Sequence, residues 1–410
     1  MLNYIWAGFF IIGFIVAICR AIFLQDLGVF ERIITGTFDM SIFAVMDIAL
    51  PLAGVMTLWL GLMNIGEKAG AIRFMSRIVG PFFSKLFPEI PKDHPANGQL
   101  LMNFSANMLG LDNAATPLGL KAMQSLQDLN PKKETASNAQ IMFLALNTSG
   151  LTIIPIAILA QRAILGSANP TDIFIPLLIS TYISTLTAIL FVGIKQKLNL
   201  INKTVIGWLS GITIAIGLLC WYVTTLNKEE MMTFSSIFSN SLLLIIIVAF
   251  ISGALYKKVN IFETFIDGAK SGFETSVKIM PYMVGMLVGI AVFRASGALD
   301  LIVLGIQKIV QLFSDHTEFV NALPTAFMKP LSGSGAKAMM VECMRTYGPD
   351  SFVGRLSCLF QGAADTTFYI VALYFGSVGI KKTRYAIGAG LIADLAGVIA
   401  AIACAYLFFG

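Results

Sequence analysis

A stretch of polar and helix-breaking residues, NFSANMLGLDNAATPLG at positions 103–119, lies inside a chain that is otherwise strongly apolar. A second stretch of the same character, KPLSGSGAK, occupies positions 329–337. Hydrocarbon offers no hydrogen-bond partners, so irregular backbone at membrane depth survives only where it is buried in protein or lines a wet cavity. Each stretch is therefore either a binding site or a loop outside the membrane. We interpret the rest of the chain as the frame that brings the two stretches together.

The composition indicates a polytopic membrane protein. Hydrophobic residues make up 57% of the chain and charged residues only 12%, against roughly 25% charged residues in soluble domains. The net charge of +5 needs no acidic partner, because basic residues confined to cytoplasmic loops give any inner-membrane protein such an excess. We therefore expect the lipid bilayer as a partner and exclude nucleic acid.

Enzyme chemistry finds little support in the sequence. The chain has two histidines and no HExxH, P-loop or GxSxG pattern. The five cysteines lie in apolar surroundings without CxxC spacing, which indicates packing rather than a disulfide framework or a metal site. We predict that the protein is not an enzyme and holds no cofactor or metal.

The first half follows a recognisable order of segments. Interfacial helices show apolar residues at helical spacing beside cations, and a helix needs about 20 apolar residues to cross a bilayer. In order, we expect a span at 2–19, a surface helix or loop at 21–40, a span at 41–65, an interfacial helix at 67–92, a re-entrant hairpin at 99–126, an interrupted span at 139–164 and an uninterrupted span at 173–194. Two further spans, 205–225 and 239–256, lie on either side of a short acidic loop and lead to the second half.

The second half repeats this order. We expect an amphipathic segment at 262–276, a span at 277–293, an interfacial helix at 299–313, a hairpin at 319–344, an interrupted span at 352–375 and a final span at 385–409. A glycine between small residues separates span from interfacial helix in both halves, Ala69-Gly70-Ala71 in the first and Ser296-Gly297-Ala298 in the second. The chain therefore divides into residues 1–200, a connection at 201–256, and residues 257–410.

The basic loops predict that the two halves have opposite orientation. Lysines at 132–133, 195–203, 257–258 and 381–382 mark cytoplasmic loops. With a cytoplasmic N-terminus, the first hairpin enters from the cytoplasm and the second from the outside. Inverted repeats whose discontinuous helices meet near the bilayer centre are the architecture of secondary transporters. We predict an all-α protein of the bacterial inner membrane with two inverted repeats, each containing a re-entrant hairpin and a broken transmembrane helix.

Several long motifs resemble known families. LFPEIPKDHP at 86–95, NAATPLGLKAM at 113–123 and LNTSGLTIIP at 146–155 resemble spore maturation protein A. MPYMVGMLVGIAVFRASGALD at 280–300 and QGAADTTFYIVALYFGSVGIKK at 361–382 resemble spore maturation protein B, as do TYGPDSFVGRLS at 346–357 and LIADLAG at 391–397. The resemblance covers nearly the whole chain and implies a fusion of the two. Both families belong to the nucleoside-recognition Gate group, which implies a distant likeness to concentrative nucleoside transporters and ferrous-iron transporters.

Polar residues at the hairpin tips and helix breaks are the candidate ligand contacts. They are Asn103, Asn107, Asp112, Asn113, Thr116, Asn147, Thr148, Ser149, Lys329, Ser332, Ser334, Lys337, Gln361, Asp365, Thr366 and Thr367. Asp365 is the sharpest candidate, because an ionisable residue inside a span is costly and by default functional. It either holds a coupling ion, Na⁺ or H⁺, or forms a buried ion pair with Lys329 or Lys337. The two lysines either bind an anionic solute or neutralise Asp365.

Structural roles remain open for the other candidates. Asn113, Thr116, Asn147 and Thr148 either contact a ligand or cap half-helix ends, which leave about four backbone groups unpaired. Glu342 and Arg345 are expected at the exit of the second hairpin, in the outer interface. Asp394 is either a helix-packing or a proton-relay residue.

Two functions from different classes fit these features. The first is a secondary transporter for a small polar or anionic solute, nucleoside-like or another metabolite. The second is a membrane scaffold or ligand sensor for spore or envelope maturation, which binds a ligand without moving it. In either case we expect a homo-oligomer.

Overall fold

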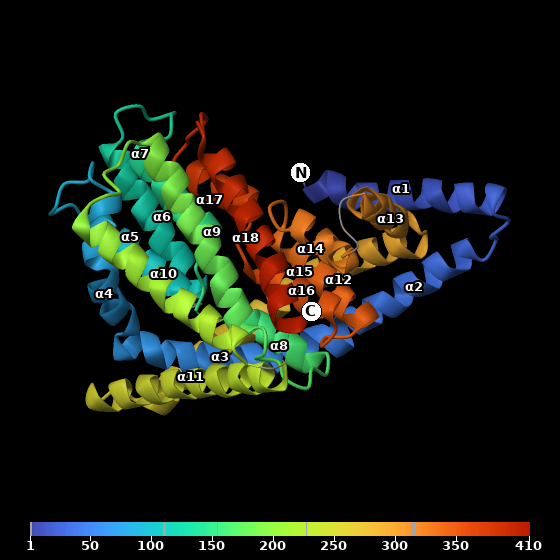
Figure 1. Cartoon of the computed structure of the whole chain (residues 1–410), viewed down its shortest axis with the longest axis horizontal. Coiled ribbons are helices and arrows are strands. Elements are labelled where there is room, and N and C mark those ends of the chain that lie inside the picture. Colours follow the sequence, from blue (N-terminus) through green and yellow to red (C-terminus); the bar gives the residue numbers. More distant parts are fainter. Residues whose placement is uncertain (1, 110–111, 154, 227, 313–315) are drawn as a thin grey trace. The chain divides into compact units, whose positions relative to one another are not determined.

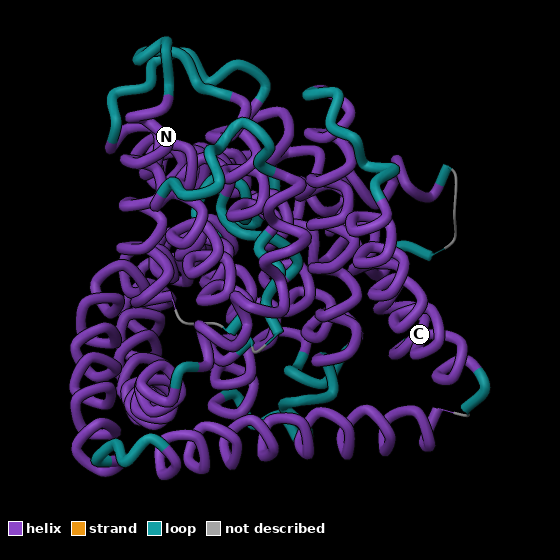
Figure 2. Tube along the Cα trace, turned by 90° about the vertical axis from the view of Figure 1, so that its left-hand side faces the viewer, coloured by secondary structure: helices purple, strands orange, loops and turns teal. Residues whose placement is uncertain are grey.

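The protein is an all-helical, multi-pass membrane protein over the residues that the structure describes, 2–109, 112–153, 155–226, 228–312 and 316–410 (Figures 1 and 2). The computed structural model contains seven helical stretches in these ranges that are long and apolar enough to cross a membrane, or eight if the bent pair Met283–Ala295 and Ala298–Gln311 counts as a span. The interrupted span predicted in the second half corresponds to one of them, Phe352–Ser377.

The helices follow the predicted order. In the first half they are α1 (Leu2–Phe23), α2 (Val29–Phe43), the π-helix η1 (Ala44–Ala49), α3 (Leu50–Ala69), α4 (Ala71–Leu86), α5 (Pro95–Met108), α6 (Asp112–Leu129), α7 (Asn138–Ser149), α8 (Ile156–Ile164) and α9 (Phe174–Lys195). The connection consists of α10 (Lys203–Thr224) and α11 (Lys228–Tyr256). The second half contains α12 (Ile261–Ala295), α13 (Ala298–Gln311), the 3₁₀ helix η2 (Glu318–Ala322), α14 (Leu323–Met328), α15 (Gly333–Tyr347), α16 (Phe352–Gly362), α17 (Thr367–Ser377) and α18 (Ala386–Phe409).

The chain forms two compact units, and each takes segments from both halves of the sequence. Unit 1 consists of Met1–Trp59, Ala157–Pro170 and Ala269–Gln361. Unit 2 consists of Leu60–Ile156, Thr171–Gly268 and Gly362–Gly410. The division falls inside both interrupted spans, so α7 and α17 belong to unit 2, while nearly all of α8 and of α16 belong to unit 1.

Unit 2 is a helical bundle with an aromatic and aliphatic core. Helices α7, α9, α17 and α18 pack side by side, and the paired helices α5 and α6 lie against them (Figure 1). The core includes Phe83, Phe104, Phe143 and Tyr374, all buried. The start of α7 is fixed by a capping box, in which Ser137 accepts from the Gln140 N–H and the Gln140 side chain accepts from the Ser137 N–H. The side chains at the end of α7 and the start of α17 are therefore carried on a well-packed frame.

Unit 1 is organised around the second hairpin. Helices α14 and α15 pack against each other, joined by a short turn at residues 329–332. The indole Nε1 of Trp6 donates to the Gly285 carbonyl at 2.8 Å, which attaches α1 to α12. Gly335 on α15 is surrounded by the Met286 and Met328 side chains, so a Cβ there would clash. The hairpin therefore has a close-packed tip.

The two glycines that separate span from interfacial helix have the same conformation. Gly70 has φ +92° and Gly297 has φ +85°, both in the left-handed region that favours glycine. At the second of them the chain bends by 69° between α12 and α13. The local repeat expected from the sequence is thus present in the backbone.

Three segment predictions differ in detail from the structure. The segment 21–40, expected as a surface helix or loop, contains α2, which continues through η1 into α3. The segments 262–276 and 277–293 form one helix, α12, and the acidic loop near 228 is the first turn of α11. Pro51 and Pro281 lie within these continuous helical stretches and do not end them. The re-entrant course of the hairpins and the inverted orientation of the halves remain predictions.

Candidate functional site

Two helix ends meet inside unit 2. Helix α7 ends at Ser149 with Gly150 in the left-handed conformation, and α17 begins at Thr367. The Asp365 N–H donates to the Thr148 carbonyl at 2.7 Å. A Cβ on Gly150 would lie 3.3 Å from the Asp365 nitrogen, so only glycine both turns the chain and permits this approach. We call this meeting point, with the side chains described below, the unit 2 junction.

Amide side chains attach the first hairpin to this junction. Asn107 Nδ2 donates to Asn147 Oδ1 at 2.9 Å, and Asn147 Nδ2 donates to the Phe143 carbonyl at 2.9 Å. The backbone adds a further link, because the Ile153 N–H donates to the Met108 carbonyl at 2.8 Å. Helix α5 and the interrupted segment after α7 are therefore held together by uncharged groups.

The buried Asp394 carboxylate on α18 holds the first residue of α17. Thr367 Oγ1 donates to Asp394 Oδ2 at 2.7 Å, and both residues are buried. Gly390, one turn earlier on α18, allows this contact, since a Cβ there would lie 2.6 Å from Thr367 Cγ2 and 3.3 Å from Thr148 Oγ1. Sequence reasoning placed Asp394 outside the site. An acid inside an apolar helix was the available signal, but its partner could not be read from the sequence.

The electrostatics of the junction suit a polar ligand. The carboxyl end of α7 carries partial negative charge and the amino end of α17 partial positive charge. Asp365 lies between them with an exposed side chain, and its Oδ1 accepts from the Thr366 N–H at 2.7 Å. Thr366 and Thr367 themselves are buried. The junction therefore offers hydrogen-bond donors, acceptors and one open carboxylate.

Several hydroxyls at the end of α7 serve their own helix. Thr148 Oγ1 donates to the Ala145 carbonyl at 3.1 Å and Ser149 Oγ to the Leu146 carbonyl at 3.3 Å. Such back-bonding is the ordinary use of hydroxyls within helices. It favours a structural role for these two hydroxyls, whereas the Asn107–Asn147 pair joins two separate elements.

The remaining candidates lie elsewhere. Asn103 is buried and donates to the Ala115 carbonyl at 2.8 Å, which ties α5 to α6. Thr116 is half-buried on α6, and the side chains of Asp112 and Asn113, like tip residues 110 and 111, lie outside the described part of the chain. In unit 1, Ser332 Oγ accepts from the Gly335 N–H and lies 3.3 Å from Ser334 Oγ.

The charged and amide candidates of unit 1 are spread along the hairpin and α16. Lys329 is buried at the end of α14, Lys337 is half-buried on α15, and Gln361 is buried at the end of α16. Because Asp365 belongs to unit 2, its pairing with either lysine remains a prediction.

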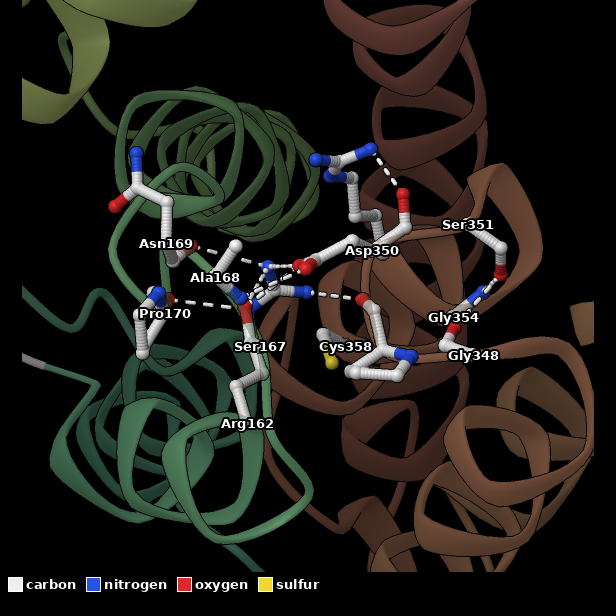
Figure 3. Close-up of polar contacts among 12 residues, drawn as sticks. Arg162, Ser167, Ala168, Asn169, Pro170, Gly348, Asp350, Ser351, Gly354 and Cys358 are labelled. Atoms are coloured by element: carbon white, nitrogen blue, oxygen red, sulfur yellow. Dashed lines mark hydrogen bonds and ion pairs between the residues drawn. The ribbon is translucent and has the colours of Figure 1, made fainter.

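A second meeting of interrupted helices, in unit 1, depends on charge (Figure 3). Arg162, at the end of α8, is fully buried and donates from Nη2 to Asp350 Oδ1 at 2.9 Å. Its other donors reach the Pro170 carbonyl at 3.1 Å, the Pro349 carbonyl at 2.6 Å and Ser167 Oγ at 2.9 Å. We call this the unit 1 clamp, and it joins the segment after α8 to the turn before α16.

Asp350 completes the clamp. It accepts from Ser167 Oγ at 2.6 Å and from the Ala168 N–H at 2.8 Å. Partial burial acts to raise the pKa of Asp350, but the Ser167 and Ala168 hydrogen bonds and the Arg162 charge outweigh it and hold the pKa below its ordinary value. The carboxylate is therefore ionised at neutral pH. Sequence reasoning missed Arg162, although a single arginine in an apolar helix was a signal.

Comparison with known proteins places the chain in a family. The family model described as nucleoside recognition, Gate, matches residues 49–164 and 276–381. The chain belongs to the Gate family. The first matched segment runs from the last residue of η1 to the end of α8, and the second from within α12 to just past α17. The two segments therefore contain helices in the same order, α3 to α8 in the first and α12 to α17 in the second.

Two curated proteins of Bacillus subtilis (strain 168) share extensive similarity with the chain. Spore maturation protein A is 44% identical over 190 residues, which cover 46% of this chain and 93% of that protein. Spore maturation protein B is 45% identical over 166 residues, which cover 40% of this chain and 92% of that protein. The predicted resemblance is confirmed, and the coverage is consistent with a fusion of the two. No solved structure matches the chain.

Proposed function

We propose that the protein is a secondary transporter for a small polar solute, nucleoside-like or another metabolite, that binds at the unit 2 junction. The observation that carries the proposal is the end-to-end meeting of α7 and α17, where the Asp365 N–H donates to the Thr148 carbonyl at 2.7 Å. Interrupted helices at membrane depth are tolerated where they line a cavity, and transporters use their ends to hold solutes and ions.

Each group at the junction has a proposed role. The backbone N–H groups at the start of α17 and the Asn107–Asn147 pair contact the solute's hydroxyl or amide groups. The exposed Asp365 carboxylate holds the coupling ion, Na⁺ or H⁺. The buried Asp394 positions α17 through Thr367, 2.7 Å away. The solute thus replaces weak, uncharged contacts rather than a buried ion pair.

The test is uptake into proteoliposomes. Vesicles containing the protein are incubated in a metabolite extract that includes nucleosides, under an imposed Na⁺ or proton gradient, and their contents are identified by mass spectrometry. We expect gradient-dependent accumulation of at least one solute, absent from protein-free vesicles and from vesicles with the Asp365→Asn variant. Contents identical to those of protein-free vesicles would contradict transport.

The second candidate is a ligand sensor or scaffold. It draws support from the relatives, whose names refer to spore maturation. A sensor binds solute at the same junction without accumulating it. Ligand-induced thermal stabilisation without uptake would therefore favour the sensor over the transporter.

The proposed orientation in the inner membrane has its own test. In a variant without native cysteines, Lys132→Cys and Arg345→Cys should react with impermeant maleimide from opposite sides of the membrane, the first from the cytoplasm. Labelling of both from one side would contradict the inverted arrangement.

A further inference from the structure

A pocket of about 230 Å³ lies in unit 1 between the interfacial helix α13 and the second hairpin. Its polar wall includes Arg294, Asp300 and Glu342, and its apolar wall includes Leu299, Val303 and Met339. It belongs neither to the unit 2 junction nor to the unit 1 clamp. The predicted segment order places it near the outer interface, at the exit of the hairpin.

Glu342 is the unusual residue of this pocket. It is only 7% exposed, and its Oε1 accepts from Arg294 Nη1 at 2.9 Å and from Thr346 Oγ1 at 3.3 Å. Its Oε2 is buried and accepts no hydrogen bond from any residue that the structure describes. A buried carboxylate oxygen without a donor is costly, and Glu342 lines the pocket, so a donor bound there would satisfy this atom.

The charged residues of the pocket wall determine whether a cation or an anion binds there. Two carboxylates, Asp300 and Glu342, face one guanidinium, Arg294. The guanidinium is already engaged, since it also donates to Thr346 Oγ1 at 2.6 Å and lies 5.9 Å from the Tyr347 ring centroid. The pocket therefore keeps a net negative charge, which favours a cation that can donate a hydrogen bond.

The volume and the apolar wall of the pocket indicate which chemical type of cation it binds. A hydrated inorganic ion gains nothing from Leu299, Val303 and Met339, whereas a short hydrocarbon chain is removed from water there. The volume lies below the roughly 300–1,000 Å³ of sites for drug-sized ligands. A small organic cation fits both walls.

We propose that this pocket binds a small organic ammonium ion, with its N–H donating to Glu342 Oε2 and its hydrocarbon part against the apolar wall. This site is independent of the proposed transport function. The ligand class is that of primary amines carrying a few carbon atoms.

The experiment measures melting temperature of the full-length protein in nanodiscs at neutral pH, titrated with n-butylammonium chloride. Butanol serves as the neutral analogue, and sodium chloride at equal ionic strength as the inorganic cation. We expect saturable stabilisation by n-butylammonium alone. Glu342→Gln should raise the apparent Kd by about tenfold or more, while Glu31→Gln, which changes an exposed glutamate on α2, should leave it unchanged.

A second variant guards against misfolding of Glu342→Gln, which disturbs the pair with Arg294. Val303→Phe fills the apolar wall and leaves every charged residue in place, so it should weaken n-butylammonium binding in a folded protein. The proposal is overturned if butanol or sodium chloride stabilises as much as n-butylammonium, if n-butylammonium has no effect, or if Val303→Phe binds as tightly as wild type.

Discussion

The unit 1 clamp and the unit 2 junction join interrupted helices by different chemistry. In the clamp, a fully buried guanidinium is surrounded by carbonyls, a hydroxyl and the Asp350 carboxylate. In the junction, one backbone hydrogen bond and an asparagine pair hold the helix ends, and the Asp365 carboxylate is exposed. Opening the clamp would strand charges in a buried site, whereas opening the junction costs only uncharged hydrogen bonds. This difference supports the proposal that the clamp is a fixed frame and the junction an exchangeable site.

The largest effect is expected from breaking the clamp. Arg162→Ala removes the guanidinium that pairs with Asp350 and the donor to the Pro170 and Pro349 carbonyls, which should cost roughly 3–5 kcal/mol of stability or prevent folding. Thermal or denaturant unfolding in detergent measures the loss. Arg73→Ala, which removes an exposed arginine on α4, is the control. An Arg162→Ala protein as stable as the control would remove the distinction between the two sites.

Acid should weaken the clamp in a defined pH range. Because the folded-state pKa of Asp350 is lowered, its contribution is complete above the unfolded-state pKa of about 3.9 and is lost as pH falls toward the lower folded-state pKa. Asp350→Asn keeps one oxygen acceptor but loses the charge, at a cost of about 1.5–3 kcal/mol. The stability difference between wild type and Asp350→Asn should shrink below about pH 4. A difference that persists unchanged to lower pH would contradict an ionised Asp350 in the clamp.

A smaller effect is expected from breaking the asparagine pair of the junction. Asn147→Ala removes the acceptor of the half-buried Asn107 amide and should cost about 1 kcal/mol, the net contribution of a typical hydrogen bond. Solute-dependent stabilisation should disappear at the same time. If Asn147→Ala destabilises the protein but keeps the full solute response, the pair is a structural contact only.

The helix breaks could be predicted because their chemistry is local. Gly150 and the residues after Gly362 interrupt apolar segments, and the glycines at 70 and 297 adopt the left-handed backbone that the repeat indicated. The segment at 21–40 was expected to be a surface helix or loop because of its charges, and the structure has helix α2 there. Those charges gather at the turn, where Arg20 reaches Asp26 at 2.9 Å, and no helix breaker interrupts the residues that follow.

The partners within each site could not be predicted in the same way. Arg162 and Asp350 are 188 residues apart in the sequence, and Asn107 and Asn147 are 40 apart. Their pairing depends on how helices pack, which no local pattern encodes. Asp365 was expected either to hold a coupling ion, Na⁺ or H⁺, or to pair with Lys329 or Lys337, and this choice remains a prediction. The structure gives Asp365 an exposed side chain, and exposure lowers the cost of an ionised carboxylate.

The most direct test of the exchangeable junction is the melting temperature of wild type and Asp365→Asn across cations, pH and candidate solutes. Asparagine keeps the Oδ1 that accepts from the Thr366 N–H, and the site is exposed, so stability without ligand should change by less than about 0.5 kcal/mol. Wild type should gain about 2.7 kcal/mol from a ligand at a hundred times its Kd, and Asp365→Asn should lose the gain from ions or solutes that need the carboxylate. A variant that melts like wild type and responds identically to every condition would contradict the account.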